Sequence, residues 1–562
     1  MRIPYGISNF KDLITGGYVY IDKTDYIAKL EEAGKYHILL RPRRFGKSLM
    51  LSALEHYYDI GSKADFEAIF SKLYIGKHPT PLQSSYQVLF MEFSGIETGS
   101  HEQILSGFNV NVNIYLQAFL KRYGYGAEAI AGLADCPAPA DKLKHVFNVA
   151  SGKKILLLVD EYDHFANTVL AEDLELFRRI TGKGGFVRSF YETVKAATQR
   201  GIVDRLFITG VTPITLDSMT SGFNIGENIS FDKSFNTVTG FTKAEVAGLL
   251  QPLIETCQLD AEKLMEDVTR WYNGYRFHPN ARESVYNANM VLYFLKNFDR
   301  EECAYPERML DDNIASDYGK LMGLFKIGNP DENYAVLDEL INTGEVIAQQ
   351  RRKFDFDKGF ERDDFISLLA YMGFASLQGK TLSGEVFAIP NHVMQELYFQ
   401  YFKVELERRN QITIPNRGLA LAVEVLALHD NLQPLADEMQ RVLQVLSNRD
   451  FTNMDEKHVK TLLLTLLYQV SFYFIQSERE MNHKYPDILL LERSPFVVQH
   501  QHLIELKYAK KSDKEKGWKA KRKEGIEQVE GYLQLPEIAT LPKLSAWVLL
   551  TDGERVDVIK MQ

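Results

Sequence analysis

Near its start the chain carries an apolar strand, a loop rich in arginine and a helix in direct succession. Residues 36–40 read YHILL, the loop reads RPRRFGKS, and residues 49–58 place apolar side chains at helical spacing. In a strand, loop and helix of this kind, the loop amides and the amino terminus of the helix bind phosphate. The segment therefore predicts a nucleotide-binding loop of the P-loop type.

The loop departs from the general P-loop pattern at one position. It ends in Gly46, Lys47 and Ser48, but Arg41 stands where the pattern has a glycine. Lys47 is expected to reach the β- and γ-phosphates of ATP, and Ser48 is expected to bind Mg²⁺. The nucleotide-binding residues predicted here are Arg43, Arg44, Phe45, Gly46, Lys47, Ser48 and Leu49.

Three arginines, Arg41, Arg43 and Arg44, lie within the loop. They are candidates for contacts with phosphate in the same chain or across an oligomer interface. Pairing with acidic neighbours is an equal alternative, and the sequence does not choose among these interpretations.

A second motif, ILLLVDEYD at residues 155–163, completes the nucleotide-site pattern. Its buried strand ends in Asp160, which is expected to bind Mg²⁺, and Glu161, which is expected to polarise the attacking water. Thr209 ends a further strand, RLFIT, and is a candidate sensor of the γ-phosphate. The alternative for Thr209 is an ordinary threonine at the end of a strand.

Apolar strands at 36–40, 87–93, 154–159 and 205–209 alternate with helical patterns. Strands buried on both faces that alternate with helices are typical of a mainly parallel sheet. The fold class predicted for this part of the chain is therefore α/β, with a P-loop NTPase core.

Two carboxylates near the carboxyl end of the chain have the spacing of a metal site. Asp487 precedes an apolar strand at 488–491, and Glu505 lies 18 residues later at the end of the next strand. A hairpin brings these ends together, and both carboxylates with the Leu506 carbonyl suit Mg²⁺ or Mn²⁺. Lys507 shares the face of Glu505 and can orient water or offset phosphate charge. The pattern predicts a metal-dependent phosphodiesterase.

The helix after these strands holds Gln528 and Tyr532 four residues apart, and Gln528 is predicted to support catalysis. Two further acids, Glu456 and Glu478, are candidates at the site, although a solvated helix charge is the favoured interpretation of Glu456. The segment before Gln528 is basic. It contains Lys510, Lys511, Lys514, Lys516, Lys519, Lys521, Arg522 and Lys523. This run predicts either a grip on a nucleic-acid backbone or a solvated charged loop.

Changes in pattern along the chain predict five parts. These are a P-loop AAA-like ATPase core at 1–245, a helical lid at 246–300, a candidate winged-helix module at 301–400, a helical linker at 401–454, and an α/β restriction-endonuclease-like domain at 455–562. The middle module rests on a hairpin-like pattern after helices, and a plain helical spacer with one hairpin is the alternative. A winged helix favours duplex DNA over RNA by analogy of fold.

The chain resembles bacterial AAA-ATPase-like proteins that carry a carboxyl-terminal PD-(D/E)XK nuclease domain. The resemblance rests on YVYIDKTDYI, LLRPRRFGKSLMLSAL, LLLVDEYD, FITGVTPI, WYNGYRF, VYN, IPN and the PD…ELK…QVEGY set, which follow one another over nearly the whole chain. In that family arginine is usual at position 41. The resemblance implies nucleotide and Mg²⁺ roles for Lys47, Ser48, Asp160 and Glu161, and nuclease roles for Asp487, Glu505 and Lys507. The family has a short glycine-containing turn where this chain reads MNHKYPD.

The bulk properties limit the partners. A net charge of −10 argues against non-specific coating of DNA. The start of the chain has no signal-peptide pattern, no apolar run spans a bilayer, and three distant cysteines predict no disulfide framework. The sequence thus predicts a cytoplasmic protein with a nucleic-acid partner, DNA before RNA, and a possible homo-oligomer. Two functions remain open: an ATP-controlled nuclease, and an NTPase switch or scaffold whose nuclease-like domain binds without cleaving.

Overall fold

The chain divides into two compact units. The structure, a computed structural model, describes residues 1–219, 222–355, 359–447, 455–477 and 486–561. Unit 1 consists of Met1–Lys296 and Leu310–His392, and unit 2 consists of Asn297–Met309 and Val393–Gln562. The nucleotide-site motifs lie in unit 1, and the metal-site motif lies in unit 2.

Unit 1 is built on a five-stranded parallel sheet. In spatial order its strands are β2 (Gln87–Glu92), β3 (Ile155–Asp160), β4 (Val203–Gly210), β1 (Tyr36–Leu40) and β5 (Glu227–Asn228). Since the strands are parallel, the loops that follow β1, β3 and β4 meet at one edge of the sheet. The predicted α/β fold with an amino-terminal parallel sheet is confirmed.

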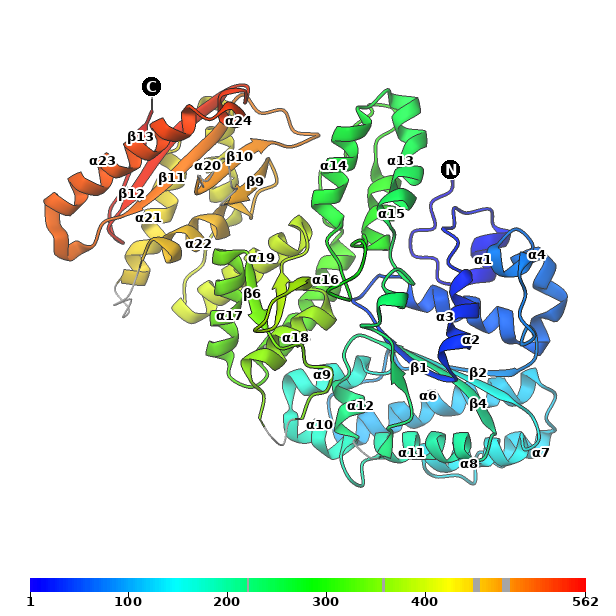
Figure 1. The fold of residues 1–562 in the computed structure, drawn as a ribbon. Coiled ribbons are helices and arrows are strands. Elements are labelled where there is room, and N and C mark those ends of the chain that lie inside the picture. Colours follow the sequence, from blue (N-terminus) through cyan, green and yellow to red (C-terminus); the bar gives the residue numbers. More distant parts are fainter. Residues whose placement is uncertain (220–221, 356–358, 448–454, 478–485, 562) are drawn as a thin grey trace. The chain divides into compact units, whose positions relative to one another are not determined.

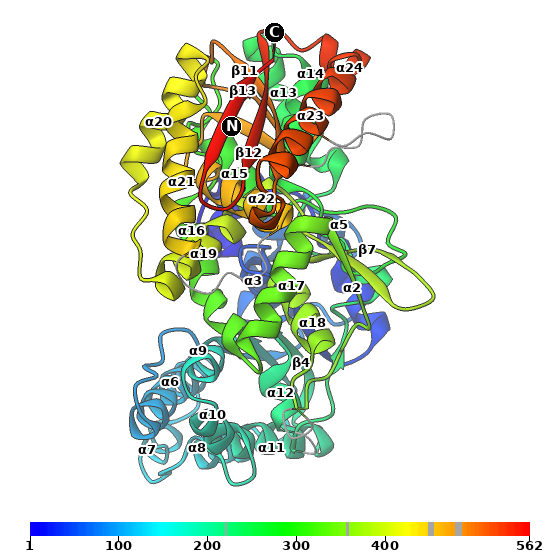
Figure 2. The ribbon, with the colours of Figure 1, turned by 90° about the vertical axis from the view of Figure 1, so that its left-hand side faces the viewer.

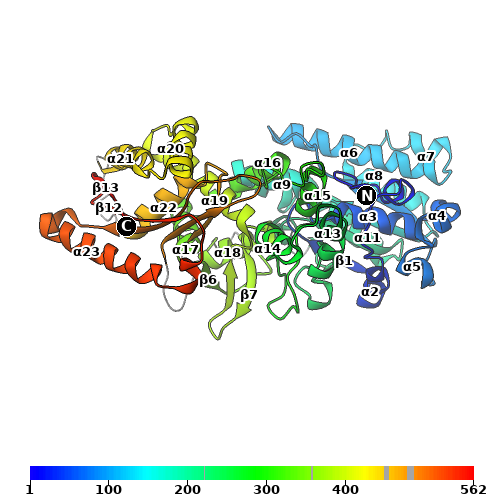
Figure 3. The same cartoon turned by 90° about the horizontal axis from the view of Figure 1, so that it is seen from above.

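Helices cover both faces of this sheet (Figures 1 and 3). One face carries α1 (Phe10–Thr15), α2 (Asp25–Ala33) and α3 (Lys47–Tyr58), and the other carries α6 (His101–Arg122), α8 (Pro139–Val149) and α11 (Phe186–Gln199). All six residues of β3 are buried, as the run ILLLVD predicts for a strand with helices on both sides. This layering leaves the carboxyl ends of the strands for ligand binding.

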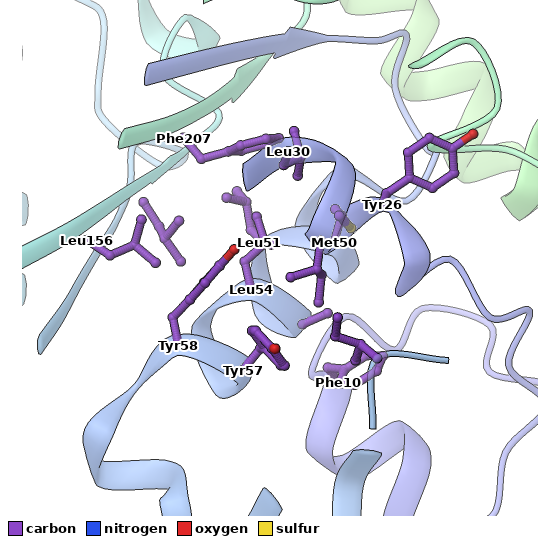
Figure 4. Close-up of a cluster of buried hydrophobic side chains, with 14 of the residues drawn as sticks. Phe10, Tyr26, Leu30, Met50, Leu51, Leu54, Tyr57, Tyr58, Leu156 and Phe207 are labelled. Atoms are coloured by element: carbon purple, nitrogen blue, oxygen red, sulfur yellow. The ribbon is translucent and has the colours of Figure 1, made fainter. Parts of the chain in front are cut away.

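Helix α3 is fixed by a dense apolar cluster (Figure 4). Leu51 and Leu54 point toward the sheet residues Leu156 and Phe207, and Tyr57 lies next to Phe10 of α1. The side chains of Leu51 and Phe10 are fully buried. Because α3 begins directly after the arginine-rich loop, this packing fixes the position of the end of the loop.

A helical lid follows the sheet. It consists of α13 (Lys243–Cys257), α14 (Ala261–Tyr272) and α15 (Ala288–Asn297), which stand beside one another in Figure 1. A capping box between Thr242 and Glu245 begins α13. Between α14 and α15, Gly274 has φ +95°, and a Cβ at this position lies 2.0 Å from the Pro390 carbonyl oxygen. Only glycine fits this close crossing of two backbones.

The rest of unit 1, the candidate winged-helix module, combines helices with a small antiparallel sheet. Its elements are α16 (Asp312–Leu321), α17 (Pro330–Thr343), β6 (Glu345–Ala348), α18 (Arg362–Met372), β7 (Ser376–Lys380) and β8 (Glu385–Ala388), with an antiparallel sheet in the order β6-β8-β7. Helix α18 takes the place of a recognition helix, but it is buried from Phe365 to Met372. It is therefore not available to enter a DNA groove, and the module gives no reason to favour DNA over RNA.

Unit 2 contains a mixed sheet. In spatial order its strands are β13 (Val556–Lys560), β12 (Leu544–Thr551), β11 (Gln501–Tyr508), β10 (Ile488–Glu492) and β9 (Tyr473–Ser477); only β11 and β12 are parallel. Its helices are α19 (His392–Asn410), α20 (Asn416–His429), α21 (Gln433–Ser447), α22 (Glu456–Leu467) and α23 (Lys514–Leu533). Figure 2 shows α20 and α21 on one side of the sheet and α23 on the other.

Two features of the chain bear on the expectations from the sequence. Of the three cysteines, Cys136 is free. Among the described residues, none of the helices combines the length and the apolar character needed to cross a membrane.

The backbone crossing at Gly274 can be tested by adding one methyl group. We expect Gly274→Ala to lower the stability of unit 1 by about 2 kcal/mol or more, because the left-handed φ and the nearby carbonyl both oppose a Cβ. Gly248→Ala is the matched control, since no atom lies within 4 Å of a Cβ at this exposed position of α13. Thermal unfolding should show a lower midpoint for the first variant only. Equal midpoints would contradict the crossing.

Candidate nucleotide and metal sites

Lys47, the lysine of the P-loop motif, forms hydrogen bonds with the loop itself. Lys47 Nζ donates hydrogen bonds to the carbonyl oxygens of Arg41 (3.0 Å) and Pro42 (2.9 Å). Gly46, with φ +92°, turns the chain into α3 and is its N-cap residue. Burial lowers the pKa of Lys47, while the nearby carboxylates of Asp160 and Glu161 oppose this shift. The ammonium group thus faces the loop, where phosphate is bound in P-loop proteins.

Arg41, which replaces the usual glycine, is a structural residue. Its guanidinium group is fully buried and donates to the carbonyl oxygens of Leu40 (3.0 Å), Ser230 (2.5 Å) and Phe235 (2.8 Å). It also lies 3.8 Å from the centroid of the Phe277 ring. None of the three interpretations offered for Arg41 holds, since it is paired with neither a phosphate position nor an acid. Through these hydrogen bonds, Arg41 connects the loop to the segment after β5.

The other two arginines contact α16 of the winged-helix module. Arg44 Nε donates a hydrogen bond to Asp317 Oδ2 (2.7 Å), and the terminal nitrogen Nη2 of Arg44 lies 2.6 Å from the same oxygen. Arg43 donates to the backbone carbonyl of Asp317 (2.9 Å) and lies 3.8 Å from its carboxylate. For Arg43 and Arg44, pairing with an acidic neighbour is therefore observed.

The motif at the end of β3 lies next to this loop. Asp160 Oδ1 accepts hydrogen bonds from Thr209 Oγ1 (2.5 Å) and from the Glu161 amide (3.0 Å). Thr209 is fully buried and lies against Asp160 because β4 is placed between β1 and β3. Neither Thr209 nor Asp160 is among the residues that line the cavity described below. The Thr209 hydroxyl orients Asp160, and the role of Thr209 as a sensor of the γ-phosphate stays a prediction. Burial raises the pKa of Glu161, and Lys47 opposes this shift.

A cavity of about 530 Å³ joins the loop to the lid and to the first residues of the chain. From the predicted set it is lined by Arg43, Arg44, Phe45, Gly46, Lys47, Ser48, Leu49 and Glu161. Further apolar lining comes from Ile7, Tyr20 and Ile21 at the start of the chain and from Phe241, Leu249 and Leu292 of the lid. Sequence reasoning assigned no role to these six residues. The motif YVYIDKTDYI was a signal for two of them, but it carries no chemistry that points to a base pocket.

In unit 2, strand register brings the two predicted metal carboxylates together. Ile488 of β10 pairs with Ile504 of β11 in an antiparallel ladder, so Asp487 and Glu505 are neighbours. The Leu506 amide donates to Asp487 Oδ2 (2.8 Å). Lys507 Nζ donates to Glu505 Oε1 (2.9 Å) and to the Leu506 carbonyl (2.8 Å). Four predicted residues thus form one cluster.

The charge balance of this cluster favours a cation. Burial, together with the charge of Asp487, raises the pKa of Glu505 to about 7, and burial raises the pKa of Asp487. Glu505 Oε2 is buried and receives no hydrogen bond of normal distance and angle from the described residues. A buried carboxylate oxygen without a donor is costly unless a cation satisfies it. Asp487, Glu505 and the Leu506 carbonyl therefore fit Mg²⁺ or Mn²⁺.

Two more residues of α22 belong to the site. Glu456 Oε2 accepts a hydrogen bond from the Tyr508 amide (3.2 Å), and its Oε1 lies 3.6 Å from Lys507 Nζ. Glu456 therefore contacts the cluster, although its side chain remains 40% exposed. Lys460 lies one turn later, is buried, and its charge lowers the pKa of Asp487. Glu456 and Lys460 are four residues apart and so share one face of a helix, a pattern that could have linked them from the sequence.

Helix α23 closes the cluster on another side. Gln528 Oε1 is buried without a hydrogen-bond partner in the described part of the chain. Burial and the carboxylates of Glu505 and Asp487 raise the pKa of Tyr532. A Cβ on Gly525 lies 3.1 Å from Lys507 Cγ, so glycine lets the helix pack against this lysine. Glu478 and most of MNHKYPD lie outside the described residues.

No set of three or more histidine, cysteine, aspartate or glutamate side chains is gathered for a metal ion, as far as the chain is described. The metal cluster therefore depends on two carboxylates and a backbone oxygen. Metal binding at such a site must compete with protons, because the ligands bind in their ionised form.

This competition gives a pH prediction. Because the pKa of Glu505 is about 7, we expect the affinity for Mn²⁺ to fall roughly fivefold between pH 7 and pH 6, and little between pH 9 and pH 8. Calorimetric titration of the whole protein with Mn²⁺, with Asp487→Asn subtracted as the control, measures this. An affinity that stays constant from pH 6 to pH 8 would show that the proton and the metal do not share the site.

Comparison with known proteins agrees with this division of sites. Residues 4–220 match the family model described as predicted AAA-ATPase, and residues 454–561 match that of the PD-(D/E)XK nuclease superfamily. A protein of Azotobacter chroococcum mcd 1, named as an uncharacterized protein in the vnfD 5′ region, is 28% identical over 301 residues, which are 52% of this chain and 52% of that protein. The chain thus spans about half the length of this relative.

Among solved structures, the Walker-type ATPase PABY2304 of Pyrococcus abyssi matches with a TM-score of 0.39 and 12% identity, over 67% of this chain and 94% of that chain. The two family matches confirm the resemblance that the motifs indicate. The chain contains a predicted AAA-ATPase domain at residues 4–220 and a domain of the PD-(D/E)XK nuclease superfamily at residues 454–561.

Proposed function

We propose that this protein binds and hydrolyses ATP in unit 1 and cleaves phosphodiester bonds of nucleic acid in unit 2, with the nucleotide controlling cleavage. The observation that carries the proposal is the buried cluster of Asp487, Glu505 and Lys507 in a chain that also holds a P-loop cavity. A domain that only binds a partner has no need of two buried carboxylates that oppose each other's ionisation.

In unit 1, each motif residue has a place that suits its proposed role. Lys47 lies where its ammonium group can turn from the loop carbonyls to the phosphates of ATP, and Ser48 follows it on the cavity wall. Asp160, oriented by Thr209, is suited to hold Mg²⁺ through water. Glu161 also lines the cavity, and its raised pKa suits a base that takes a proton from water.

In unit 2, a bound Mg²⁺ or Mn²⁺ supplies Lewis acidity to the phosphodiester and lowers the pKa of bound water. The side chains around the metal position would orient water and substrate. Lys507, paired with Glu505, can orient a water molecule and offset the charge that develops on phosphate. Gln528 presents its buried Oε1 from α23 and can accept a hydrogen bond from water or substrate.

Helix α23 also supports nucleic acid as the substrate class. Its second half carries Gln528 beside the carboxylates, and its first half is basic. No carboxylate of the described residues lies within 4.0 Å of the amino or guanidinium groups of Lys510, Lys514, Lys516, Lys519 and Arg522, whereas Lys511, Lys521 and Lys523 are paired with glutamates. Apart from Lys510, which precedes α23, these unpaired cations lie on one helix and suit the phosphates of a nucleic-acid backbone. The alternative of a charged loop fits only Lys510 and Lys511, since α23 begins at Lys514.

Trp518 does not act as a base-stacking residue in this account. It is 7% exposed, and the guanidinium group of Arg555 lies 3.5 Å from its ring centroid. Trp518 therefore anchors the first half of α23 to the sheet and keeps the basic side chains in place.

The proposal predicts metal-dependent cleavage that depends on Asp487. Wild-type protein should cut plasmid, single-stranded DNA or RNA in the presence of Mg²⁺ or Mn²⁺, and Asp487→Ala should lower the rate at least about a hundredfold. Asp437→Ala, which removes an exposed carboxylate of α21, is the control and should behave as wild type.

A gel assay of the three substrates measures this rate and identifies the substrate class. Cleavage that survives in Asp487→Ala would refute the proposed nuclease site. ATP binding without cleavage of any substrate would favour the alternative function, an NTPase switch or scaffold whose second domain binds without cutting.

The role of α23 gives a separate prediction. Replacing both Lys516 and Lys519 by glutamine should raise KM several-fold, leave kcat nearly unchanged, and reduce the slope of log KM against log salt by about 1 to 2. Lys523→Gln is the control, because Glu527 already offsets its charge (3.6 Å). Steady-state kinetics at several salt concentrations measure both effects. An unchanged KM in the double variant would exclude this helix from substrate binding.

A further inference from the structure

Two of the cationic side chains that line the nucleotide cavity contact one acidic residue. Arg43, Arg44 and Asp317 all line this cavity. Arg44 binds the Asp317 carboxylate, whereas Arg43 donates to the Asp317 backbone carbonyl and lies 3.8 Å from the carboxylate. The two nitrogens of Arg44 that contact Asp317 Oδ2 lie within 2.7 Å of it. Arg44 has φ +67°, which residues other than glycine rarely adopt, so its backbone is strained where this contact forms.

Asp317 comes from outside the P-loop core. It lies on α16, 97 residues beyond the last residue of the AAA-ATPase match at 220. The same loop also meets α18 of this module, because a Cβ on Gly373 lies 2.7 Å from Pro42. The winged-helix module and the phosphate-binding loop are therefore in direct contact within unit 1.

We propose that Asp317 competes with the terminal phosphate of the nucleotide for Arg43 and Arg44, so that nucleotide binding loosens α16 from the loop. The inference rests on the proposed binding of ATP in this cavity. It adds a positioning residue and a route of control that the P-loop motifs do not contain.

The charges on the cavity wall support this competition. Arg43, Lys47 and Glu161 all line the cavity, and the charge of Arg43 lowers the pKa of the other two. A phosphate held by Lys47 is thus close to Arg43 and offers more negative charge than one carboxylate. Arginine prefers paired contacts with phosphate or carboxylate oxygens, and one guanidinium group cannot make both sets fully.

Competition of this kind is reciprocal. If nucleotide weakens the contact of Asp317 with the arginines, then loss of that contact must strengthen nucleotide binding by the same factor. A triphosphate should be affected more than a diphosphate, because its extra phosphate extends toward Glu161 and Arg43. Asp317 then reports whether the γ-phosphate is present.

The experiment compares the binding of ATPγS and ADP, each with Mg²⁺, by calorimetry on the full chain. We expect Asp317→Asn to bind ATPγS roughly fivefold or more tightly than wild type, with a smaller change for ADP. Asp317→Glu retains the charge and should keep the wild-type ratio of the two affinities. Glu332→Gln removes an exposed acid from α17 of the same module and is the control.

Hydrogen exchange gives the second readout. In the wild type, amides of residues 312–321 should exchange faster with ATPγS than with ADP, and in Asp317→Asn they should exchange fast in both. Two results would overturn the inference. One is a ratio of ATPγS to ADP affinity that is the same in Asp317→Asn as in the wild type, and the other is hydrogen exchange of α16 at the same rate with both nucleotides. Absence of nucleotide binding in the wild type would instead refute the proposed function on which it rests.

Discussion

The loop between β1 and α3 is the point on which the nucleotide site depends, and several different segments of unit 1 hold its residues in place. Arg41 binds backbone carbonyls after β5, Arg43 and Arg44 bind α16, and Lys47 binds the loop itself. Phe45 packs edge-on against Tyr275 and accepts a hydrogen bond from the Gly240 amide. A general P-loop has glycine at position 41, whereas this loop has Arg41 there and is also held by contacts with the lid segment and the candidate winged-helix module. These contacts link the phosphate-binding residues to both modules.

The metal cluster of unit 2 depends on a different constraint, which is the cost of two buried carboxylates. Asp487 and Glu505 raise the free energy of the ionised site, and Lys507 offsets only part of that cost. Under the proposed function a divalent cation would offset the rest, which would couple metal binding to the fold of this edge of the sheet. Glu456 joins from α22 and fixes both the Tyr508 amide and the position of Lys507.

The sequence predicted the sheet of unit 1 and both site motifs because strands buried on two faces and hairpin carboxylates leave local patterns. It did not predict that Arg41 is buried among carbonyls, or that Thr209 orients Asp160, because both contacts join segments far apart in the chain. Asp317 gave no signal either, since a single acid on a helix looks like an ordinary surface charge. The hairpin of the candidate winged-helix module was predicted from its pattern, but the burial of α18 was decided by packing that a periodic pattern does not record.

The most direct test of nucleotide control is the rate of cleavage in three states of the wild-type protein: without nucleotide, with ADP and with ATPγS, at one fixed concentration of Mn²⁺. The account predicts rates that differ several-fold between these states, and a single rate in all three for Lys47→Ala, which cannot hold the phosphates. Equal rates in all three states of the wild type would contradict it, because the nucleotide would then have no effect on the metal site.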